Sequence, residues 1–318
     1  MKKTLRALLI LLLSCPSLHA ADKIRISFPD LAAQFVPLPL GERKGFFQEE
    51  GLQAEFVRIR PTVALAALVS GEIDYDMVIG NGITGAIRGL PVKGVASYVP
   101  GAPIALIARP EFKSVQELKG KAIGLNTFGT ALEVVARLIF KHFGVDADKE
   151  IKFLALGTVD ARFAAMKQGL TVATLGSPPL DYLGKKLGFV VLARAHELFS
   201  YPLSGLVASV KKIKEKPDEI RRVIKVGIKA SRYIRQNREG TLPVMVEWLK
   251  IDKEIAAATY ESVWKAFNED GGVPENGLRL MIDEQKKLAK VDREVSLSEV
   301  VDLSILREAQ RELGIATR

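Results

Sequence analysis

The sequence is poor in the residue types that build disulfide and metal sites. Its 318 residues include one cysteine, at position 15, and three histidines. A single cysteine cannot close an intrachain disulfide, and His142 and His196 have no neighbours at metal-ligand spacing. We therefore expect no metal, no cofactor and no catalytic role for either histidine.

Signatures of two common enzyme classes are missing as well. The sequence contains no G-x-S-x-G elbow, and the glycines at positions 124 and 129 have P-loop spacing without the Lys-Ser/Thr pair that a P-loop needs. A nucleophile elbow and a P-loop are thereby excluded. We expect a protein that is not an enzyme.

The first twenty residues have the pattern of a secretory signal peptide. Lys2, Lys3 and Arg6 precede a Leu-rich stretch without acidic or basic residues other than a histidine, which runs from residue 7 to residue 19. This stretch is too short to span a bilayer, which takes about 20 apolar residues, and small residues at its end suit cleavage after Ala20. We expect a periplasmic protein.

Cys15 leaves one alternative open. The residues around it partly resemble the lipobox at which bacterial lipoproteins are cut and acylated, although Pro16 directly after the cysteine argues against that processing. In the favoured case Cys15 is removed with the signal peptide. In the alternative the protein is anchored to a membrane at Cys15.

Positive charge is concentrated in one segment. The formal net charge is +9, and between Lys211 and Glu239 eleven Lys or Arg residues stand against four Asp or Glu. Export separates the protein from nucleic acid, and the segment has no nucleic-acid recognition motif, so we expect no nucleic-acid partner. A solvated helix face is the favoured interpretation; docking on anionic lipid or on an acidic permease rim is the alternative.

Short β-branched or apolar runs alternate with helical patterns, which is typical of an α/β fold with mostly parallel sheets flanked by helices. The predicted strands are 24–28, 54–59, 76–79, 92–99, 122–125, 151–154, 172–175 and 189–192. From Lys211 onward strand patterns stop and helices follow one another. Pro217 is placed to begin one of these helices, and Asp252 is placed to cap another.

Two extended segments without a helix, 102–110 and 201–209, join the two series of strands. Paired crossings of this kind predict two lobes, with a hinge of two segments. After the signal peptide at 1–20, lobe I would comprise residues 21–105 and 205–318, the latter forming a helical C-terminal extension. Lobe II would be inserted between them at 106–204.

Four turns that lead from a strand toward a helix are candidate ligand contacts, because ligands of open α/β sheets lie beyond the carboxyl ends of the strands. Helix starts offer unpaired N–H groups and partial positive charge, so they suit an anion. The loop after the first strand adds an amide and an aromatic side chain. The candidate ligand-binding residues are Gln34, Phe35, Arg60, Thr62, Asn81, Gly82, Thr84, Asn126, Thr127, Phe128, Gly129, Thr130 and Ser177.

Simpler roles compete with ligand binding at several positions. Ordinary N-capping would explain Thr84, Thr130 and Ser177 equally well. A solvated strand edge is the default interpretation of Asp74 and Asp76. Packing is the favoured role of four large aromatic residues, Tyr98, Tyr201, Trp248 and Trp264.

The sequence resembles the substrate-binding proteins of ABC transporters for nitrate, taurine and aliphatic sulfonates, which are related to thiamine-pyrimidine-precursor binding proteins. The residues that carry the resemblance are Gly45-Phe-Phe-Gln-Glu-Glu-Gly-Leu52, Ala67-Leu-Val-Ser-Gly-Glu-Ile-Asp74, Val115-Gln-Glu-Leu-Lys-Gly-Lys121, Met166-Lys-Gln-Gly169, Pro178-Pro179 and Tyr201-Pro202. They follow one another over nearly the whole chain. The sequence departs from the pattern at Thr171-Val-Ala-Thr174, where many relatives carry Asp-Ala.

The resemblance implies a type II periplasmic-binding-protein fold whose cleft closes on a small solute before the protein docks on a membrane permease. It points to the same turns as cleft positions. We thus expect a monomer with two partners, a small anionic organic ligand and an ABC permease. Two alternatives stay open: a pyrimidine-precursor binding or synthase-like protein, and an envelope sensory protein.

Overall fold

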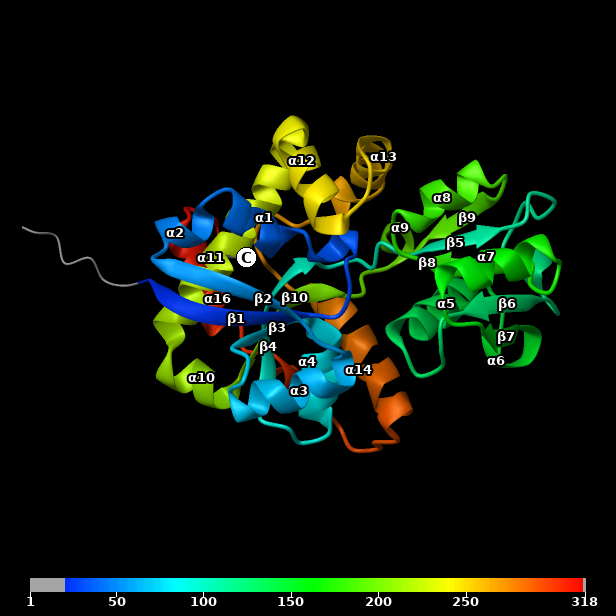
Figure 1. Ribbon diagram of the computed structural model, residues 1–318. Helices are drawn as coiled ribbons and strands as arrows, with labels where there is room; N and C mark the ends of the chain where they lie inside the picture. Colours follow the sequence, from blue (N-terminus) through cyan, green and yellow to red (C-terminus); the bar gives the residue numbers. More distant parts are fainter. Residues whose placement is uncertain (1–20, 317–318) are drawn as a thin grey trace, which may run out of the picture.

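The computed structural model describes residues 21–316 and folds into two lobes (Figure 1). The predicted signal peptide and Cys15 lie outside the described residues. Each lobe is built on a mixed five-stranded sheet covered by helices. Both the α/β class and the two-lobed architecture therefore agree with the sequence patterns.

The sheet of lobe I has the order β2-β1-β3-β10-β4. Its strands are β1 (Asp22–Phe28), β2 (Leu52–Arg58), β3 (Tyr75–Val78), β4 (Val92–Val99) and β10 (Ser204–Ser209). Strands β2 and β3 pair parallel with β1, whereas β10 pairs antiparallel with both β3 and β4. The last strand in the sequence, β10, thus lies between β3 and β4.

The sheet of lobe II has the order β7-β6-β8-β5-β9. Its strands are β5 (Ala105–Ala108), β6 (Ala122–Leu125), β7 (Lys152–Ala155), β8 (Ala173–Gly176) and β9 (Val190–Arg194). Strand β6 pairs parallel with β7 and β8, and β5 pairs antiparallel with β8 and β9. Strands β5 and β10 belong to the two segments predicted as crossings. Strand β5 forms part of the lobe II sheet, and β10 forms part of the lobe I sheet.

Helices cover both sheets, and those of the C-terminal part return to lobe I. Lobe I has η1 (Ala33–Phe35), α1 (Pro37–Arg43), α2 (Phe46–Glu49), α3 (Pro61–Ser70), α4 (Ile79–Ile87), α10 (Val210–Glu215), α11 (Pro217–Gln236), α12 (Arg238–Leu249), α13 (Lys253–Val263), η3 (Trp264–Ala266), α14 (Glu275–Ala289), α15 (Leu297–Val300) and α16 (Ser304–Glu312). Lobe II has η2 (Gln116–Leu118), α5 (Ala131–His142), α6 (Ala147–Glu150), α7 (Val159–Lys167), α8 (Leu180–Lys186) and α9 (Ala195–Leu198).

Local sequence signals explain several helix boundaries. Pro61 and Pro217 occupy the first positions of α3 and α11, where the missing N–H costs no helical hydrogen bond. The Asp252 side chain accepts a hydrogen bond of 2.8 Å from the Ile255 N–H and so caps α13 as predicted. Gly144, with φ of +73°, follows the end of α5 and stops that helix.

The largest apolar core crosses the junction between the lobes. It joins Ile83 of α4 and Met281 of α14 through Tyr201 to Leu125 and Ile139 of lobe II. Tyr98, which lies in a second core of lobe I, is fully buried, as is Tyr201. The predicted packing role of both tyrosines is confirmed.

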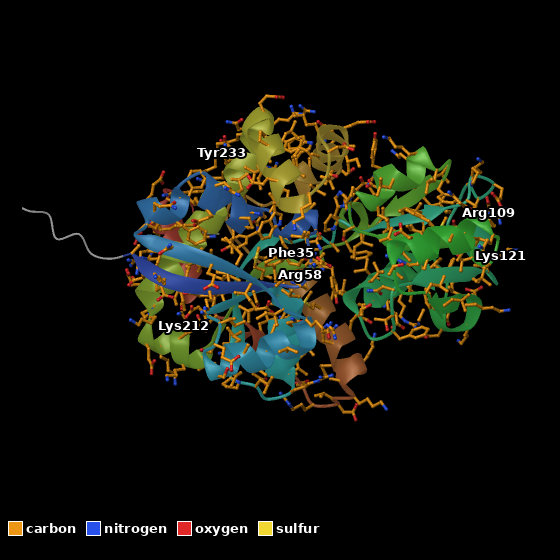
Figure 2. All side chains as sticks on the ribbon, in the orientation of Figure 1. Phe35, Arg58, Arg109, Lys121, Lys212 and Tyr233 are labelled. Carbon is orange, nitrogen blue, oxygen red and sulfur yellow. The ribbon has the colours of Figure 1, made fainter. Side chains whose placement is uncertain are left out.

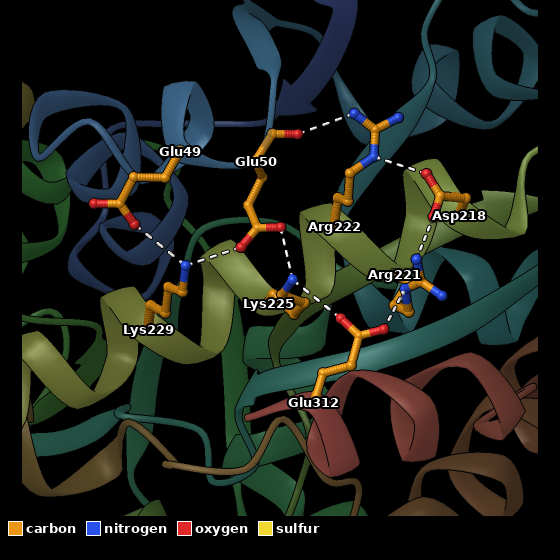
Figure 3. Close-up of polar contacts among 8 residues, drawn as sticks. All are labelled: Glu49, Glu50, Asp218, Arg221, Arg222, Lys225, Lys229 and Glu312. Carbon is orange, nitrogen blue, oxygen red and sulfur yellow. Dashed lines mark hydrogen bonds and ion pairs between the residues drawn. The ribbon is translucent and has the colours of Figure 1, made fainter. Parts of the chain in front are cut away.

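The basic segment forms ion pairs between helices and is not a free solvated face. In Figure 3, four cations of α11 meet acids of α2, α11 and α16. The Glu50 side chain, which is 9% exposed, accepts 2.8 Å contacts from both Lys225 and Lys229. Glu312 lies 3.1 Å from Lys225 and 3.0 Å from Arg221. Much of the charge surplus of α11 is thereby engaged inside lobe I, which leaves less of it for docking.

We predict that Glu50→Gln destabilises the protein by about 1–3 kcal/mol near neutral pH, because two lysines lose a shared carboxylate. Burial raises the pKa of Glu50, but the hydrogen bonds from Lys225 and Lys229 outweigh burial, and the pKa falls below 4.5. The stabilisation by these contacts is present at pH values above the pKa that Glu50 has in the unfolded chain. It is lost as the pH falls through the lower pKa that Glu50 has in the folded protein.

Urea unfolding of the wild type and Glu50→Gln at neutral and acid pH would check this expectation. Glu49→Gln is a matched control, because Glu49 contacts Lys229 but its side chain is 56% exposed, so the loss should be at most about 1 kcal/mol. Equal losses for the two variants would contradict the prediction.

Candidate functional site

The carboxyl ends of strands from both sheets face one another across the junction between the lobes. Strand β10 enters lobe I from a crossing and therefore runs away from lobe II, so the antiparallel β3, and with it β1 and β2, runs toward lobe II. By the same reasoning β5 runs away from lobe I, and β8 and β6 run toward it. We call this opposed set of strand ends the interlobe face. It is where an α/β sheet holds a ligand.

The loop after β1 contributes one polar side chain to this region. Gln34 in η1 is 7% exposed, and its Oε1 atom has no hydrogen-bond partner among the described residues. Phe35 is 3% exposed and packs in the core of lobe I, although Figure 2 shows it at the end that faces lobe II. The prediction of Phe35 as an aromatic wall is therefore wrong, because its ring is taken up by packing.

Arg60 directly precedes α3, as the sequence predicts. It is the N-cap residue with an extended backbone, its carbonyl accepts from the N–H groups of Val63 and Ala64, and its side chain makes no capping bond. The residue is exposed. Its charge is thus available beside the start of a helix. The side chain of Thr62 lies outside the described part of the structure.

The segment expected as a turn after β3 is the first half of α4. Asn81 Nδ2 donates 3.1 Å to Asp76, and Thr84 Oγ1 donates to Gly80 O at 2.8 Å and to Gln285 Oε1 of α14 at 2.7 Å. Thr84 lies inside the helix, so it is not an N-cap. Both predictions, a loop and a cap at this segment, are wrong because the helix begins at Ile79, directly after the strand.

Gly82 serves packing at this helix. A Cβ atom on Gly82 would lie 2.6 Å from Cγ1 of Val207 on β10, and one on Gly85 would lie 3.0 Å from Val92 Cγ2. With Gly80 these residues spell G-x-G-x-x-G at a strand-to-helix junction, a dinucleotide-binding pattern. No acidic residue follows near the end of β4, where that fold family needs one for the ribose. The glycines instead let α4 approach the sheet, which corrects the expectation of ligand contact at Gly82.

Asp76 is the polar residue of this region that sequence reasoning misjudged. It is 1% exposed and accepts hydrogen bonds from Ser27 Oγ at 2.9 Å and from Asn81. Burial raises its pKa to about 6 against the hydrogen bonds that lower it. The expected solvated edge is wrong because β3 is an inner strand between β1 and β10. Asp74 instead pairs with Lys212 at 2.5 Å.

In lobe II the loop from residue 126 to residue 130 is organised by its own side chains. Asn126 Oδ1 accepts from the Thr127 N–H at 2.7 Å and from Thr130 Oγ1 at 3.1 Å. Gly129 has φ of +74° and donates its N–H to Glu133. Thr130 is the N-cap residue of α5, but its side chain makes no capping bond.

Phe128 stands at the tip of this loop. Its side chain is 54% exposed. It follows β6 at the interlobe face, so an exposed ring and the start of α5 are presented together. Of the two predicted aromatic site residues, Phe128 is the exposed one, and its contact with a ligand stays a prediction.

Ser177 follows β8 and precedes α8, whose N-cap residue is Pro179. The Ser177 carbonyl accepts from the Leu180 N–H at 3.0 Å, so its backbone shapes the turn, and the predicted N-cap role is wrong. Asp181, the second residue of α8, bridges the two lobes. Its Oδ2 accepts from Ser262 Oγ of α13 at 2.9 Å and pairs with Arg194 at 2.6 Å.

Two surface pockets are each lined by residues of one lobe only. One, of about 450 Å³, lies between α1, α12 and the ends of β1 and β2, and the other, of about 390 Å³, runs along β9. None of the predicted ligand residues lines either pocket. The predicted site thus depends on the opposed strand ends and their helix starts.

Neither a metal site nor a membrane span is found in residues 21–316. No group of three or more His, Cys, Asp or Glu side chains among these residues could hold a metal ion. Within the same range no helix is long and apolar enough to cross a membrane.

The fold is that of periplasmic binding proteins. The chain superposes on SsuA, the periplasmic aliphatic sulphonate binding protein of Escherichia coli, with a TM-score of 0.72 and 17% identity over 88% of this chain and 92% of SsuA. It also superposes on the desulfurization enzyme DszB, with a TM-score of 0.67 and 12% identity over 92% of this chain and 99% of DszB. At these identities the likeness concerns the fold alone.

Residues 32–240 match the profile of the NMT1/THI5-like family, and the chain belongs to that family. A binding protein of Brucella abortus (strain 2308) is 27% identical over 265 residues, which cover 79% of this chain and 80% of the Brucella protein. The sequence relationship therefore extends over both lobes.

Proposed function

We propose that this chain is the extracytoplasmic solute-binding component of an ABC importer and captures a small anionic organic solute between its lobes. The observation that carries the proposal is that strand carboxyl ends of the two sheets oppose each other across a junction crossed by two chain segments. Such an arrangement lets lobes close on a ligand. The Brucella binding protein and SsuA support the class, and aliphatic sulphonate binding by SsuA supports an anionic ligand.

Charge at the interlobe face indicates where the anionic group would bind. Asp76 is a buried carboxylate beside the start of α4, so it already occupies the positive end of that helix and would repel a second anion. The start of α3 has Arg60 exposed. The first turn of α5 also holds a buried acid, Glu133, but Arg137 pairs with it at 2.7 Å, unlike Asp76 at α4. We expect the anionic group between Arg60 and the start of α5, with Phe128 against the apolar part of the solute.

A thermal-shift panel of sulfonates, carboxylates, nitrate and pyrimidines would test the function. A solute present at about 100 times its Kd should stabilise the folded protein by about 2.7 kcal/mol and raise the melting temperature accordingly. Failure of all four classes would contradict a small-solute receptor. A response confined to the pyrimidines would favour the pyrimidine-precursor alternative.

We predict that Arg60→Ala weakens binding of the best anion of that panel by about tenfold, because one charge-assisted contact of about 1.4 kcal/mol is lost. Isothermal titration would measure the affinity. Arg88→Ala is a matched control, since Arg88 is also exposed and follows α4 at the end remote from β3. Equal affinities for both variants would remove Arg60 from the site.

The absence of catalysis is also part of the proposal. The fold is shared with an enzyme, DszB, so fold alone does not decide between binding and turnover. The only cysteine lies at position 15, so residues 21–318 contain no thiol nucleophile. Recovery of each bound solute unchanged after long incubation is the expected result, and a modified solute would overturn the assignment.

The biological setting completes the proposal. After removal of residues 1–20 the protein would work in the periplasm as a monomer and deliver solute to a membrane permease. Lobe I would comprise 21–105 and 205–318, and lobe II 106–204. Crosslinking in intact cells should capture a permease; capture of a signalling receptor in its place would favour the sensory alternative.

A further inference from the structure

A pocket of about 450 Å³ in lobe I has the composition of a second small-molecule site. We call it the α12 pocket. It is lined by Phe28, Leu31, Pro39, Glu42, Arg43, Phe56, Arg58, Val244, Glu247, Trp248 and Lys250. All of these residues belong to α1, α12 or the β1–β2 side of lobe I, and lobe II contributes none.

Three aromatic rings form the apolar wall of the α12 pocket. The Trp248 ring lies 4.8 Å from Phe28 and 5.6 Å from Phe56, measured between ring centroids, and is tilted by 51° and 72°. Trp248 thus has the predicted packing role toward the sheet, yet it also lines the pocket. Edge and face contacts of this kind favour a planar aromatic ligand.

Hydrogen-bond donors without partners accompany the aromatic wall. Trp248 Nε1 is buried and has no hydrogen-bond partner among the described residues. Arg58 donates Nε–H to Pro29 O at 3.2 Å, and in the described part of the chain its terminal nitrogens form no hydrogen bond. Lys250 ends α12 with φ of +56° and is exposed. Indole, guanidinium and ammonium groups are all donors, so together they call for an acceptor.

The acidic side chains that line the pocket are less free to contact a ligand than its basic side chains. Glu247 is paired with Arg43, which leaves that ion pair close to neutral. Burial raises the pKa of Glu42, although Gln48 and Arg43 act to lower it, and Glu42 Oε2 is buried without a partner in residues 21–316. Among the lining residues Arg58 and Lys250 then outnumber Glu42, although Arg58 also interacts with the carboxylate of Asp30 outside the lining.

We propose that the α12 pocket binds an aromatic carboxylate, with its ring against Phe28, Phe56 and Trp248. The carboxylate accepts from Trp248 Nε1–H and from the Arg58 and Lys250 side chains. Phe28 and Arg58 end two strands of the interlobe face, but lobe II contributes no lining residue, so this site is separate from the proposed solute cleft. The protein would then carry one ligand between its lobes and a second within lobe I.

Nuclear magnetic resonance of the two tryptophan indole N–H groups would test the proposal with 2-naphthoate as the probe. The sequence has only Trp248 and Trp264, so each spectrum contains an internal control, and Trp264→Phe assigns the two signals. We expect the Trp248 signal to shift saturably with a stoichiometry of one, as its N–H gains an acceptor. The Trp264 signal should stay in place.

Substitutions would show whether the named donors hold the carboxylate. Arg58→Gln and Lys250→Asn should each weaken 2-naphthoate binding by about fivefold or more, because each removes a charge-assisted contact; Asn suits the left-handed backbone at residue 250. Arg88→Gln is the charge-matched control and should leave the affinity unchanged. The neutral analogue 2-naphthalenemethanol should bind at least about tenfold more weakly than 2-naphthoate.

Three outcomes would overturn the inference. These are no saturable shift of Trp248, unchanged affinity in both Arg58→Gln and Lys250→Asn, or loss of the shift on Arg60→Ala, which would place the probe at the interlobe face. Because the last variant separates the two sites, failure of the α12 pocket would leave the proposed solute receptor intact. Circular dichroism of each variant would verify that it is folded.

Discussion

Replacing Gly82 with alanine is expected to lower the free energy of unfolding by about 1–3 kcal/mol. The new methyl group would meet Val207 at 2.6 Å from Cγ1 and 2.8 Å from Cγ2, well inside van der Waals contact. Val207 is fully buried on β10, so it cannot swing into solvent. The helix must therefore move away from the sheet, and its start at the interlobe face must move with it.

Gly80→Ala is the matched control for this substitution. Gly80 lies two residues earlier in α4, and a methyl group there would meet only Met281, at 3.9 Å. Alanine favours a helix over glycine by about 1 kcal/mol, so this variant should be neutral or slightly stabilised. Chemical denaturation of the wild type and the two variants would measure the difference. A Gly82→Ala variant as stable as Gly80→Ala would refute close packing of α4 on β10.

The wild-type protein should lose about 3 kcal/mol of stability through Asp76 as the pH rises from about 4 to about 6. Burial raises the pKa of Asp76 from 3.8 to about 6 in the folded protein. Between these values the folded state retains a proton that the unfolded state has released, so stability falls with rising pH. Below this window both states are protonated, and above it the full cost of a buried charge is present.

Asp76→Asn removes the titrating group and should remove this slope from the pH dependence of unfolding. Urea titrations at several pH values, taken as the difference between variant and wild type, would isolate the effect from other carboxylates. Ser27→Ala offers a second check, because the loss of its hydrogen bond to Asp76 should raise the pKa further and extend the slope to higher pH. If the stability of Asp76→Asn still fell with rising pH in this window, Asp76 would not be the group responsible for the effect.

Where local patterns decide the structure, the sequence predicted it well. Strands β4 and β6 have the bounds that their apolar runs indicated, and α11 begins at Pro217. These features depend on residue alternation and on the fixed φ of proline, which act within one element. The two crossings were also visible, because 102–110 and 201–209 have the pattern of extended segments without an attached helix.

The candidate site was predictable only in outline. The sequence placed Arg60 and Phe128 at strand ends, and both are exposed there. It did not show that Phe35 packs in the core or that Asp76 is buried, because burial of a side chain depends on strands and helices distant in the sequence. Asp76 is covered since β10, which lies more than a hundred residues later, pairs beside β3.

The α/β class and two lobes followed from the sequence by itself, since periodicity is read along the chain. Export stays a prediction from the first twenty residues, which lie outside the described structure. Only the tertiary structure decided which cations are free. The lysines of α11 meet Glu50 and Glu312 across helices, whereas Arg58 and Lys250 line the α12 pocket. Charge is a property of a residue, but its availability depends on neighbours that folding brings together.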